Sequence, residues 1–520
     1  MKMPQSIYII NPKADGPTYH SAEVFTHLGL PPIALIADLS ITTVAALVPA
    51  DFEVTLCDEQ IALADLDHPA TFVGLTGKGS QAGRMLELAQ EFRRRGKTVI
   101  LGGPYASLSP TAVRPYADVL VRGEIETIAP QLFADLRSGC WQAEYIGDRP
   151  DLHLSPLPRW DMYPNHNAMA GCLQTSRGCP FECEFCDVIQ YVGRRQRHKP
   201  VPQILAELDL LYQQGYHHVF IADDNFTAHH GRVKEILIAM RDWNNRQPDG
   251  RLTFSTQLSI DAAKHADILQ LCTEAGITYV LIGLETPNEA SLRETKKRQN
   301  VGLDLVEHIQ RFLDYGIAVM GGLIVGFDAD GLDIFERQDQ LAMAVPVPIF
   351  MLGALIAPET TPLYARLQRD HRLLSEQKPG ANAPWETNIV PQQMTRDQLL
   401  TGLRWLGNRL YHPAAFGQRV AQFLDNYHQP PAAGWRIRKR YTAVEKGLME
   451  VAQSVCRLGS EEKRMFFETA VALVKKPAVQ ALLMHMMFQY AQIRYVYQQN
   501  GFWEPQLAEH SAPDFLRAEV

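Results

Sequence analysis

The sequence lacks the features that mark membrane or secreted proteins. It has no run of about 18 apolar residues, as a membrane span needs. Its first apolar stretch, 7–10, is too short for a signal peptide and ends at Asn11 and Pro12. Cysteine is scarce, with eight in 520 residues, and three of these fall within eight positions. This is not a disulfide framework, so we expect a cytoplasmic protein in a reducing compartment with a metal site.

Excess positive charge is also absent. The 58 acidic residues outnumber the 50 basic ones and give a net charge of −8, which predicts no nucleic-acid partner. Repeats and low-complexity segments are missing too. Hydrophobic residues make up 46% of the chain, enough for a large core, and the length suggests about three domains.

Strand and helix signals alternate through residues 1–140. The last three expected strands are followed by turns that contain glycine, and two segments between the strands have helical spacing. This alternation predicts a parallel sheet whose ligand binds at the carboxyl ends of the strands. The strands are expected at 7–10, 52–56, 72–75, 98–101 and 119–121, and the helices at 34–47 and 85–95.

A proline-rich linker at 141–168 precedes a second alternating region at 169–365. Six β/α units there predict an open doubly wound sheet or a partial barrel, and periodicity leaves both open. From 366 to 520 the pattern is helical. The six strands are expected at 172–176, 218–222, 252–257, 279–284, 318–325 and 349–355, and the late helices at 399–411, 444–458 and 479–497.

The strongest chemical signal is the segment 176–186, in which Cys179, Cys183 and Cys186 follow an expected strand. Three thiolates in one loop can bind three irons of a 4Fe–4S cluster and leave the fourth iron open for a small ligand. The alternatives are inert core cysteines or a zinc site, for which Cys172 and His198 are candidate fourth ligands.

This segment resembles the motif of the radical S-adenosylmethionine (SAM) superfamily, cysteine-x3-cysteine-x-aromatic-cysteine, with Phe185 at the aromatic position. The resemblance implies that the three cysteines ligate a 4Fe–4S cluster, that SAM binds the fourth iron, and that Phe185 packs near the adenine. Reductive cleavage of SAM would give a 5′-deoxyadenosyl radical. The SAM contacts implied at the later strand ends are Asp223, Asp224, Asn225, Ser255, Gln257, Gly283 and Glu285. Asp223 to Asn225 stand where the family has a glycine-glycine-glutamate motif, so only their polar function carries over.

The domain that precedes the barrel resembles that of the cobalamin-binding radical SAM subfamily. The residues implied at the cobalamin are Asp58, Thr76, Gly102, Gly103 and Glu124. The cobalt-binding histidine motif of many cobalamin domains is absent after Asp58, so we expect no histidine on cobalt. A dinucleotide-binding domain is the alternative, although glycines 77–83 do not have the dinucleotide spacing.

The resemblance therefore implies an α/β chain of three domains: a Rossmann-like cobalamin-binding domain, a (β/α)6 partial-barrel radical SAM domain, and an α-helical C-terminal domain. The implied function is cobalamin-dependent C-methylation, with a flavodoxin- or ferredoxin-type electron donor. The tail resembles that of the branch that includes hopanoid 2-methyltransferases, which points to a large apolar substrate. The alternatives are cyclisation or tetrapyrrole chemistry without methyl transfer, and a non-catalytic cobalamin or redox sensor.

Two features of the tail remain open. The apolar stretch 484–497 is typical of ordinary helix packing, and the alternative is a cap over an apolar substrate. Trp435 and the basic residues at 436–440 are typical of a solvated surface, and the alternative is contact with an anionic membrane. We therefore expect a cytoplasmic protein, with membrane association as the second interpretation.

Overall fold

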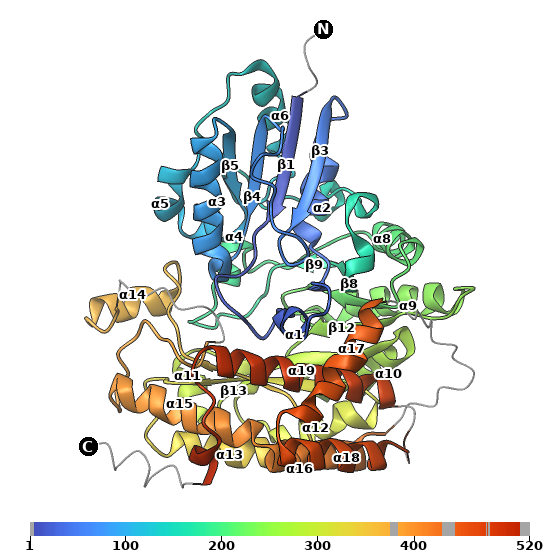
Figure 1. Cartoon of the computed structure of the whole chain (residues 1–520), viewed down its shortest axis with the longest axis vertical. Coiled ribbons are helices and arrows are strands. Elements are labelled where there is room, and N and C mark those ends of the chain that lie inside the picture. Colours follow the sequence, from blue (N-terminus) through green and yellow to red (C-terminus); the bar gives the residue numbers. More distant parts are fainter. Residues whose placement is uncertain (1–4, 375–382, 429–442, 475, 477–478, 510–520) are drawn as a thin grey trace. The chain divides into compact units, whose positions relative to one another are not determined.

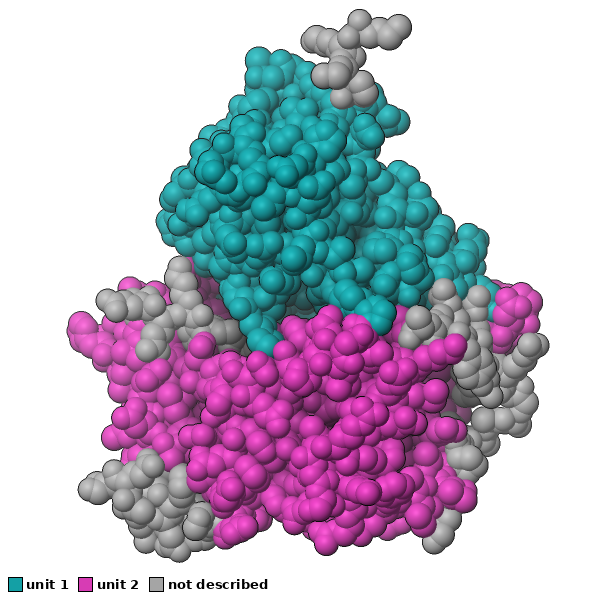
Figure 2. Space-filling model, in the orientation of Figure 1, with its two compact units in different colours: residues 1–17, 31–180, 186–224 teal, residues 18–30, 181–185, 225–520 magenta. Residues whose placement is uncertain are grey.

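The computed structural model describes residues 5–374, 383–428, 443–474, 476 and 479–509 (Figure 1). The chain divides into two compact units, coloured separately in Figure 2. The first contains residues 1–17, 31–180 and 186–224, and the second contains 18–30, 181–185 and 225–520. The basic cluster beside Trp435 lies outside the described residues.

The first unit contains a six-stranded parallel sheet. All five expected strands are confirmed, and a sixth, β7, was not expected. Because every pairing is parallel, the carboxyl ends of the strands lie along one edge. The order is β3 (Phe52–Asp58), β1 (Gln5–Asn11), β4 (Phe72–Thr76), β5 (Thr98–Gly102), β6 (Val119–Arg122) and β7 (Glu144–Ile146).

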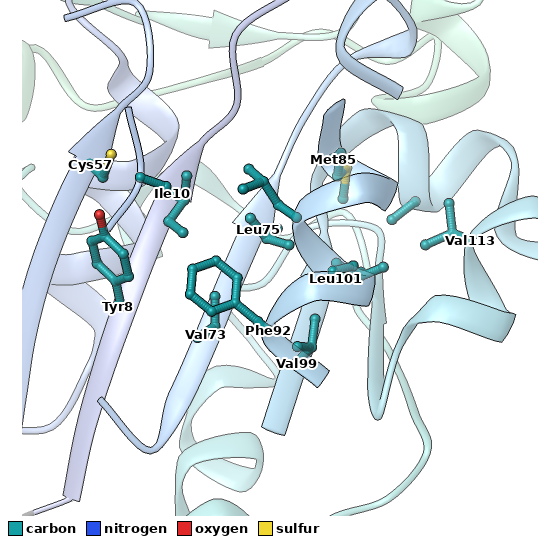
Figure 3. Close-up of a cluster of buried hydrophobic side chains, with 14 of the residues drawn as sticks. Tyr8, Ile10, Cys57, Val73, Leu75, Met85, Phe92, Val99, Leu101 and Val113 are labelled. Atoms are coloured by element: carbon teal, nitrogen blue, oxygen red, sulfur yellow. The ribbon is translucent and has the colours of Figure 1, made fainter. Parts of the chain in front are cut away.

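Helix α3 (Ala82–Arg94) closes one side of this core. Its apolar residues recur every three or four positions, so they form one stripe that faces the sheet. Figure 3 shows Phe92 of α3 beside Val73 and Val99, and all three side chains are at most 1% exposed. Burial of such side chains stabilises each by roughly 1.5–3 kcal/mol relative to an exposed position.

The expected helix at 34–47 is wrong at its start. Residues Ala34–Ile36 form β2, which pairs in parallel with β8 (Ala168–Leu173). The helix α2 (Leu39–Leu47) begins only after Asp38, whose carboxylate accepts a hydrogen bond from the Ile41 N–H at 2.9 Å. Asp38 is a standard N-cap, which fixes the start of the helix there.

Seven further strands form a second sheet. Five of the six strands expected at 172–355 are present at the expected places. The strand expected at 172–176 starts earlier, as β8, and β2 is the addition at one edge. The order is β15 (Phe350–Ala354), β14 (Ala318–Val325), β13 (Ile277–Glu285), β12 (Thr253–Gln257), β11 (His218–Ile221), β8 and β2. The pairings of β8 with β11, and of β12, β13, β14 and β15 in sequence order, are parallel, as in β/α units.

Helices make up most of the described part of the chain after residue 361, as predicted. Among the described helices, none is both long enough and apolar enough to cross a membrane. They are α14 (Pro362–Arg369), α15 (Arg396–Tyr411), α16 (Pro413–Asn426), α17 (Ala443–Ser454), α18 (Ser460–Val474) and α19 (Gln480–Gln499).

Helix α19 is buried along most of its length and packs on residues 18–30 of the same unit. The Gln492 side-chain oxygen accepts a hydrogen bond from the Val24 N–H at 3.2 Å. The rings of Phe25 and Phe488 lie 5.9 Å apart. The apolar stretch noted in the sequence is therefore interior rather than solvent-exposed.

Candidate functional site

A short antiparallel ladder leads into the cysteine loop in the first unit. It pairs β9 (Ser176–Arg177) with β10 (Arg197–His198). Gly178 follows with φ of +103°, and a side chain there would come within 2.6 Å of a backbone carbonyl oxygen, so the position requires glycine. The Cys179 N–H donates to the Gly193 carbonyl at 3.2 Å. The chain therefore turns sharply into the first cysteine.

Two adjacent carboxylates hold this turn. Asp223 is buried and accepts four hydrogen bonds of 2.6–3.1 Å from the N–H and hydroxyl groups of Thr175 and Ser176. Asp224 accepts one from the Gly178 N–H at 2.8 Å. Burial raises the pKa of both carboxyls, that of Asp224 to about 6. Both predicted SAM contacts therefore bind the segment that precedes the motif.

The middle of the motif, 181–185, contacts distant segments of the second unit. The Arg366 guanidinium donates two hydrogen bonds to the Glu184 carboxylate, at 2.9 and 3.1 Å. The Gln299 side-chain N–H donates to Cys183 Sγ at 3.5 Å. The first of these ties the motif to α14 at the start of the helical tail. The second places a donor on a sulfur that the motif assigns to iron.

The three thiols of the motif suit a cubane cluster. Cys179, Cys183 and Cys186 form no disulfide, and all three are partly or fully buried. In the described part of the chain, no three histidine, cysteine or acidic side chains are arranged to hold one metal ion. A cubane cluster does not need three side chains around one ion, because each thiolate binds a different iron of the cluster. An amide donor on Cys183 Sγ also fits a charged thiolate. Phe185 lies 6.0 Å from the ring of Phe327.

Three of the predicted contacts on β12 and β13 share one face of the sheet. The register pairs Ser255 with Tyr279 and Gln257 with Leu281, and partners in a parallel ladder point to the same side. Ser255, Gln257 and Gly283 are all half-buried on that side. Asn225 precedes β12 and donates from its amide to the Ser259 hydroxyl at 2.8 Å.

Glu285 ends β13 in a strained conformation. Its φ of +62° is uncommon for a residue with a side chain and costs on the order of 1–3 kcal/mol. Lys297 pairs with its carboxylate at 2.6 Å, and Gln338 donates to its carbonyl at 2.9 Å. A side chain at Gly283 would overlap this carboxylate. Strained backbone of this kind is typical of functional sites. Here the ion pair of Glu285 with Lys297 lies against the backbone of Gly283 at the end of the strand.

Asp58, a predicted cobalamin contact, ends β3 in the first unit. Its buried carboxylate accepts hydrogen bonds from the Tyr163 hydroxyl at 2.7 Å, the Asn11 amide at 3.1 Å and the Gln60 N–H at 3.0 Å. Burial, reinforced by the charge of Asp38, raises the pKa of Asp58 to about 7. The carboxyl therefore changes charge near neutral pH.

The other predicted cobalamin contacts lie at neighbouring strand ends of the same sheet. Thr76 ends β4 and Gly102 ends β5, and these two residues pair in register. Gly103 follows with φ of +85°, and a side chain there would overlap the Thr76 hydroxyl. Glu124 follows β6, and its carboxylate pairs with Arg177 at 2.6 Å and with Arg197 at 2.5 Å. Glu124 thus fixes the ladder that leads to Cys179.

Three residues of the site were not predicted from the sequence: Gln299, Lys297 and Arg366. Each belongs to no motif, and each meets its partner across 12 to 182 residues of chain. Glutamine, lysine and arginine are ordinary surface residues, so the sequence carries no local signal for them.

Two family models match this chain. The model described as radical SAM superfamily matches residues 173–337, and a domain of unknown function (DUF4070) matches residues 361–500. An uncharacterized methyltransferase of Synechocystis sp. is 34% identical over 396 residues, which covers 73% of this chain and 72% of the relative. The hopanoid C-2 methylase of Rhodopseudomonas palustris is 27% identical over 467 residues, which covers 87% and 86%.

Two solved structures are similar in fold. The radical SAM methyltransferase TsrM from Kitasatospora setae, solved with cobalamin and a [4Fe-4S] cluster, gives a TM-score of 0.54 at 16% identity and covers 71% of this chain and 75% of its own. The cobalamin-dependent SAM radical enzyme OxsB gives 0.59 at 15% identity and covers 99% and 83%. This likeness identifies the seven-stranded sheet as a curled, open half-barrel, so the partial-barrel alternative is confirmed.

Proposed function

We propose a reaction for this chain from its family: the chain belongs to the radical SAM superfamily, in the methyltransferase branch that includes hopanoid C-2 methylase. The proposed activity is cobalamin-dependent methylation of an unactivated carbon of a large apolar substrate, a hopanoid-type polycyclic lipid. Similarity to the hopanoid C-2 methylase along 86% of that enzyme supports the substrate class.

The observation that carries the chemistry is the cysteine loop. Cys179, Cys183 and Cys186 would hold a 4Fe–4S cluster and leave one iron for SAM. When bound, the cluster would supply the electron that cleaves SAM, and cobalamin would supply the methyl group. The electron would come from a flavodoxin- or ferredoxin-type donor. The protein fixes the loop through Gly178 and through the Arg366 pair with Glu184.

The proposed SAM contacts follow from their places in the fold. Ser255 and Gln257 offer uncharged polar groups on the half-buried face of the sheet, and bare backbone at Gly283 allows close approach of a ligand. Phe185 offers an aromatic ring beside the cysteines. Asp223, Asp224, Asn225 and Glu285 already bind protein groups, so their proposed role is to hold the loops that contact SAM.

The proposed cobalamin contacts are Asp58, Thr76, Gly102, Gly103 and Glu124. All five lie at or just after strand ends, and Gly103 has a positive φ that favours glycine, which suits a bulky cofactor with a nucleotide tail. None of the five is a histidine.

We expect the cobalt(II) form of bound cobalamin to lack a protein histidine ligand. The measurement is electron paramagnetic resonance of the protein loaded with cobalamin and reduced to cobalt(II). The expected spectrum has no nitrogen superhyperfine splitting that comes from a protein histidine. A spectrum with that splitting, lost on substituting one histidine of the first unit such as His68→Ala, would contradict the prediction.

Replacing Gln299 with leucine is expected to lower the reduction potential of the cluster. The amide donor on Cys183 Sγ stabilises the more negative, reduced state. A hydrogen bond worth roughly 0.5–1.5 kcal/mol corresponds to about 20–60 mV for one electron. The measurement is a spectroscopic redox titration. Gln299→Asn, which keeps an amide, is the conservative control, and an unchanged potential in Gln299→Leu would refute the hydrogen bond.

The test of the proposed function is a methylation assay. Protein purified without oxygen and loaded with iron, sulfide and cobalamin is given a reductant, SAM labelled in its methyl group, and a hopanoid. Label in the hopanoid and release of 5′-deoxyadenosine are the expected results. Label transferred to a chlorophyll-type pigment instead would replace the proposed substrate. Deoxyadenosine without label in any lipid or pigment would reject methyl transfer.

A further inference from the structure

One face of the barrel strands in the second unit borders accessible space. On β13, Val280, Ile282 and Leu284 are each 0% exposed. The intervening residues Leu281 and Gly283 are half-buried. In a fully packed sheet both faces would be closed, so the alternate residues line a region that solvent or a ligand can enter.

The same alternation continues on β14, so the accessible region is shared by neighbouring strands. Met320, Gly322 and Ile324 are half-buried, while the residues between them are buried. The register pairs Leu281 with Met320 and Gly283 with Gly322, which places these four residues on one face. We call this surface the inner face. Its lining is apolar, with bare backbone at the paired glycines.

Helix α19 of the tail reaches this inner face through polar side chains. The Gln489 amide oxygen accepts a hydrogen bond from the Tyr279 hydroxyl at 2.9 Å, and its amide N–H donates to Met320 Sδ at 3.4 Å. The His485 ring, one helical turn earlier, packs edge-on against the Tyr279 ring with centroids 5.5 Å apart. The tail therefore contributes polar groups to the inner face.

His485 differs from Gln489 because its polarity is not used by the protein. Its ring packs against Tyr279 and Phe488. Within the described residues no hydrogen bond to its ring nitrogens is found, and part of the residue stays accessible. Burial lowers the pKa of His485 to about 4, so the imidazole is neutral near pH 7. A neutral imidazole offers one donor and one acceptor.

We infer that α19 forms one wall of the substrate site and that His485 hydrogen-bonds an uncharged oxygen of the substrate, remote from the carbon that reacts. A neutral ring among aromatic side chains does not favour an anionic group, so the ligand is a hydroxyl or carbonyl on an apolar body. This inference rests on the proposed function and deepens it by naming how that substrate is recognised.

The position of His485 also indicates how long the substrate must be. Its neighbour Tyr279 is the third residue of β13, whereas Gly283 lies near the carboxyl end, where the proposed SAM contacts are. Four residues of strand span about 13 Å at roughly 3.3 Å per residue. A substrate that reaches from one to the other must therefore be long, which fits a polycyclic lipid better than a small metabolite.

The experiment compares two probes: a hopanoid alcohol and the matched hopanoid hydrocarbon without the hydroxyl. Both are radiolabelled, held in detergent, and bound at equilibrium to holoenzyme loaded with cluster and cobalamin. The wild type is expected to bind the alcohol about five- to tenfold more tightly, as one hydrogen bond in a dry site gives. His485→Phe keeps the ring and is expected to lose that preference while it still binds the hydrocarbon.

Two further variants make the result specific. His485→Asn keeps a donor and an acceptor and should retain part of the preference. Gln498→Leu removes an exposed amide from the same helix and should retain all of it. Equal binding of the two probes by the wild type, or an unchanged preference in His485→Phe, would overturn the inference and leave the proposed function standing. If neither probe binds and neither is methylated, the polycyclic-lipid substrate is wrong, and the inference falls with it.

Discussion

Replacing Cys183 with alanine is expected to abolish SAM cleavage. Three thiolates bind three irons of the cubane and leave the fourth open for SAM. With one thiolate fewer, a second iron would have no protein ligand, so the loop cannot lose a cysteine and keep the cluster. Cys183 is also the cysteine whose sulfur accepts the Gln299 amide hydrogen bond, so its substitution removes both the iron ligand and this hydrogen bond. The readouts are iron and sulfide content, the visible absorption of the cluster, and 5′-deoxyadenosine formed after reduction.

The matched control is Cys272→Ala, which removes a buried thiol from α10 (Ala266–Ala275) of the same unit. That variant is expected to bind a full cluster and to cleave SAM at the wild-type rate. A Cys183→Ala protein that retained full cleavage would contradict the assignment. Wild-type protein that bound one zinc per chain and no cluster would favour the zinc alternative instead.

The fold was predictable where periodicity and turns are local. Strand segments and segments of helical spacing alternate along the chain, and five of the six strands expected at 172–355 are found at the expected places. The strand Ala34–Ile36 was not predictable, because three apolar residues carry no periodicity and become a strand only by pairing with Ala168–Leu173. Asp38 is a residue type that favours the N-cap, so the sequence contained a local signal for the start of the helix. The expected range 34–47 did not take it into account.

The residues of the candidate site also divide into those predictable from local sequence and those that were not. The three cysteines and Phe185 were recognised from their spacing, because one loop contains the whole ligand set. The residues that fix this loop are remote in sequence, and Arg366 meets Glu184 across 182 positions. Only the folded chain brings such pairs together. Glu124 shows the reverse case: the family resemblance implied a cofactor contact, and its carboxylate pairs with two arginines.

Replacing Lys199 with methionine is expected to destabilise the first unit by about 3–5 kcal/mol, the cost of leaving a buried charge without its partner. Lys199 pairs with Glu207 at 2.5 Å, and the two side chains are 2% and 1% exposed. The backbone N–H of Lys199 donates to the Thr175 carbonyl at 2.9 Å, next to the strand pair that leads to Cys179. The pair therefore supports the entry to the cysteine loop.

The pH dependence of this loss has a defined sign. Burial raises the pKa of Glu207, and Lys199 opposes that shift. Without Lys199 the folded-state pKa rises further above the unfolded value of roughly 4.3. The folded variant then takes up a proton more readily than the unfolded chain, so its deficit is largest above the folded pKa and shrinks as the pH falls toward 4.3.

Chemical denaturation of single and double variants measures the effect. Lys199→Met combined with Glu207→Leu removes both charges and is expected to recover most of the loss, because two apolar side chains can replace a buried ion pair. The control is Lys234→Met, which breaks the exposed pair with Asp267 and should cost less than about 1 kcal/mol. A Lys199→Met protein as stable as this control would show that the Lys199–Glu207 pair does not stabilise the unit. A double variant no more stable than Lys199→Met would show that the lost contact, rather than the stranded carboxylate, is the source of the cost.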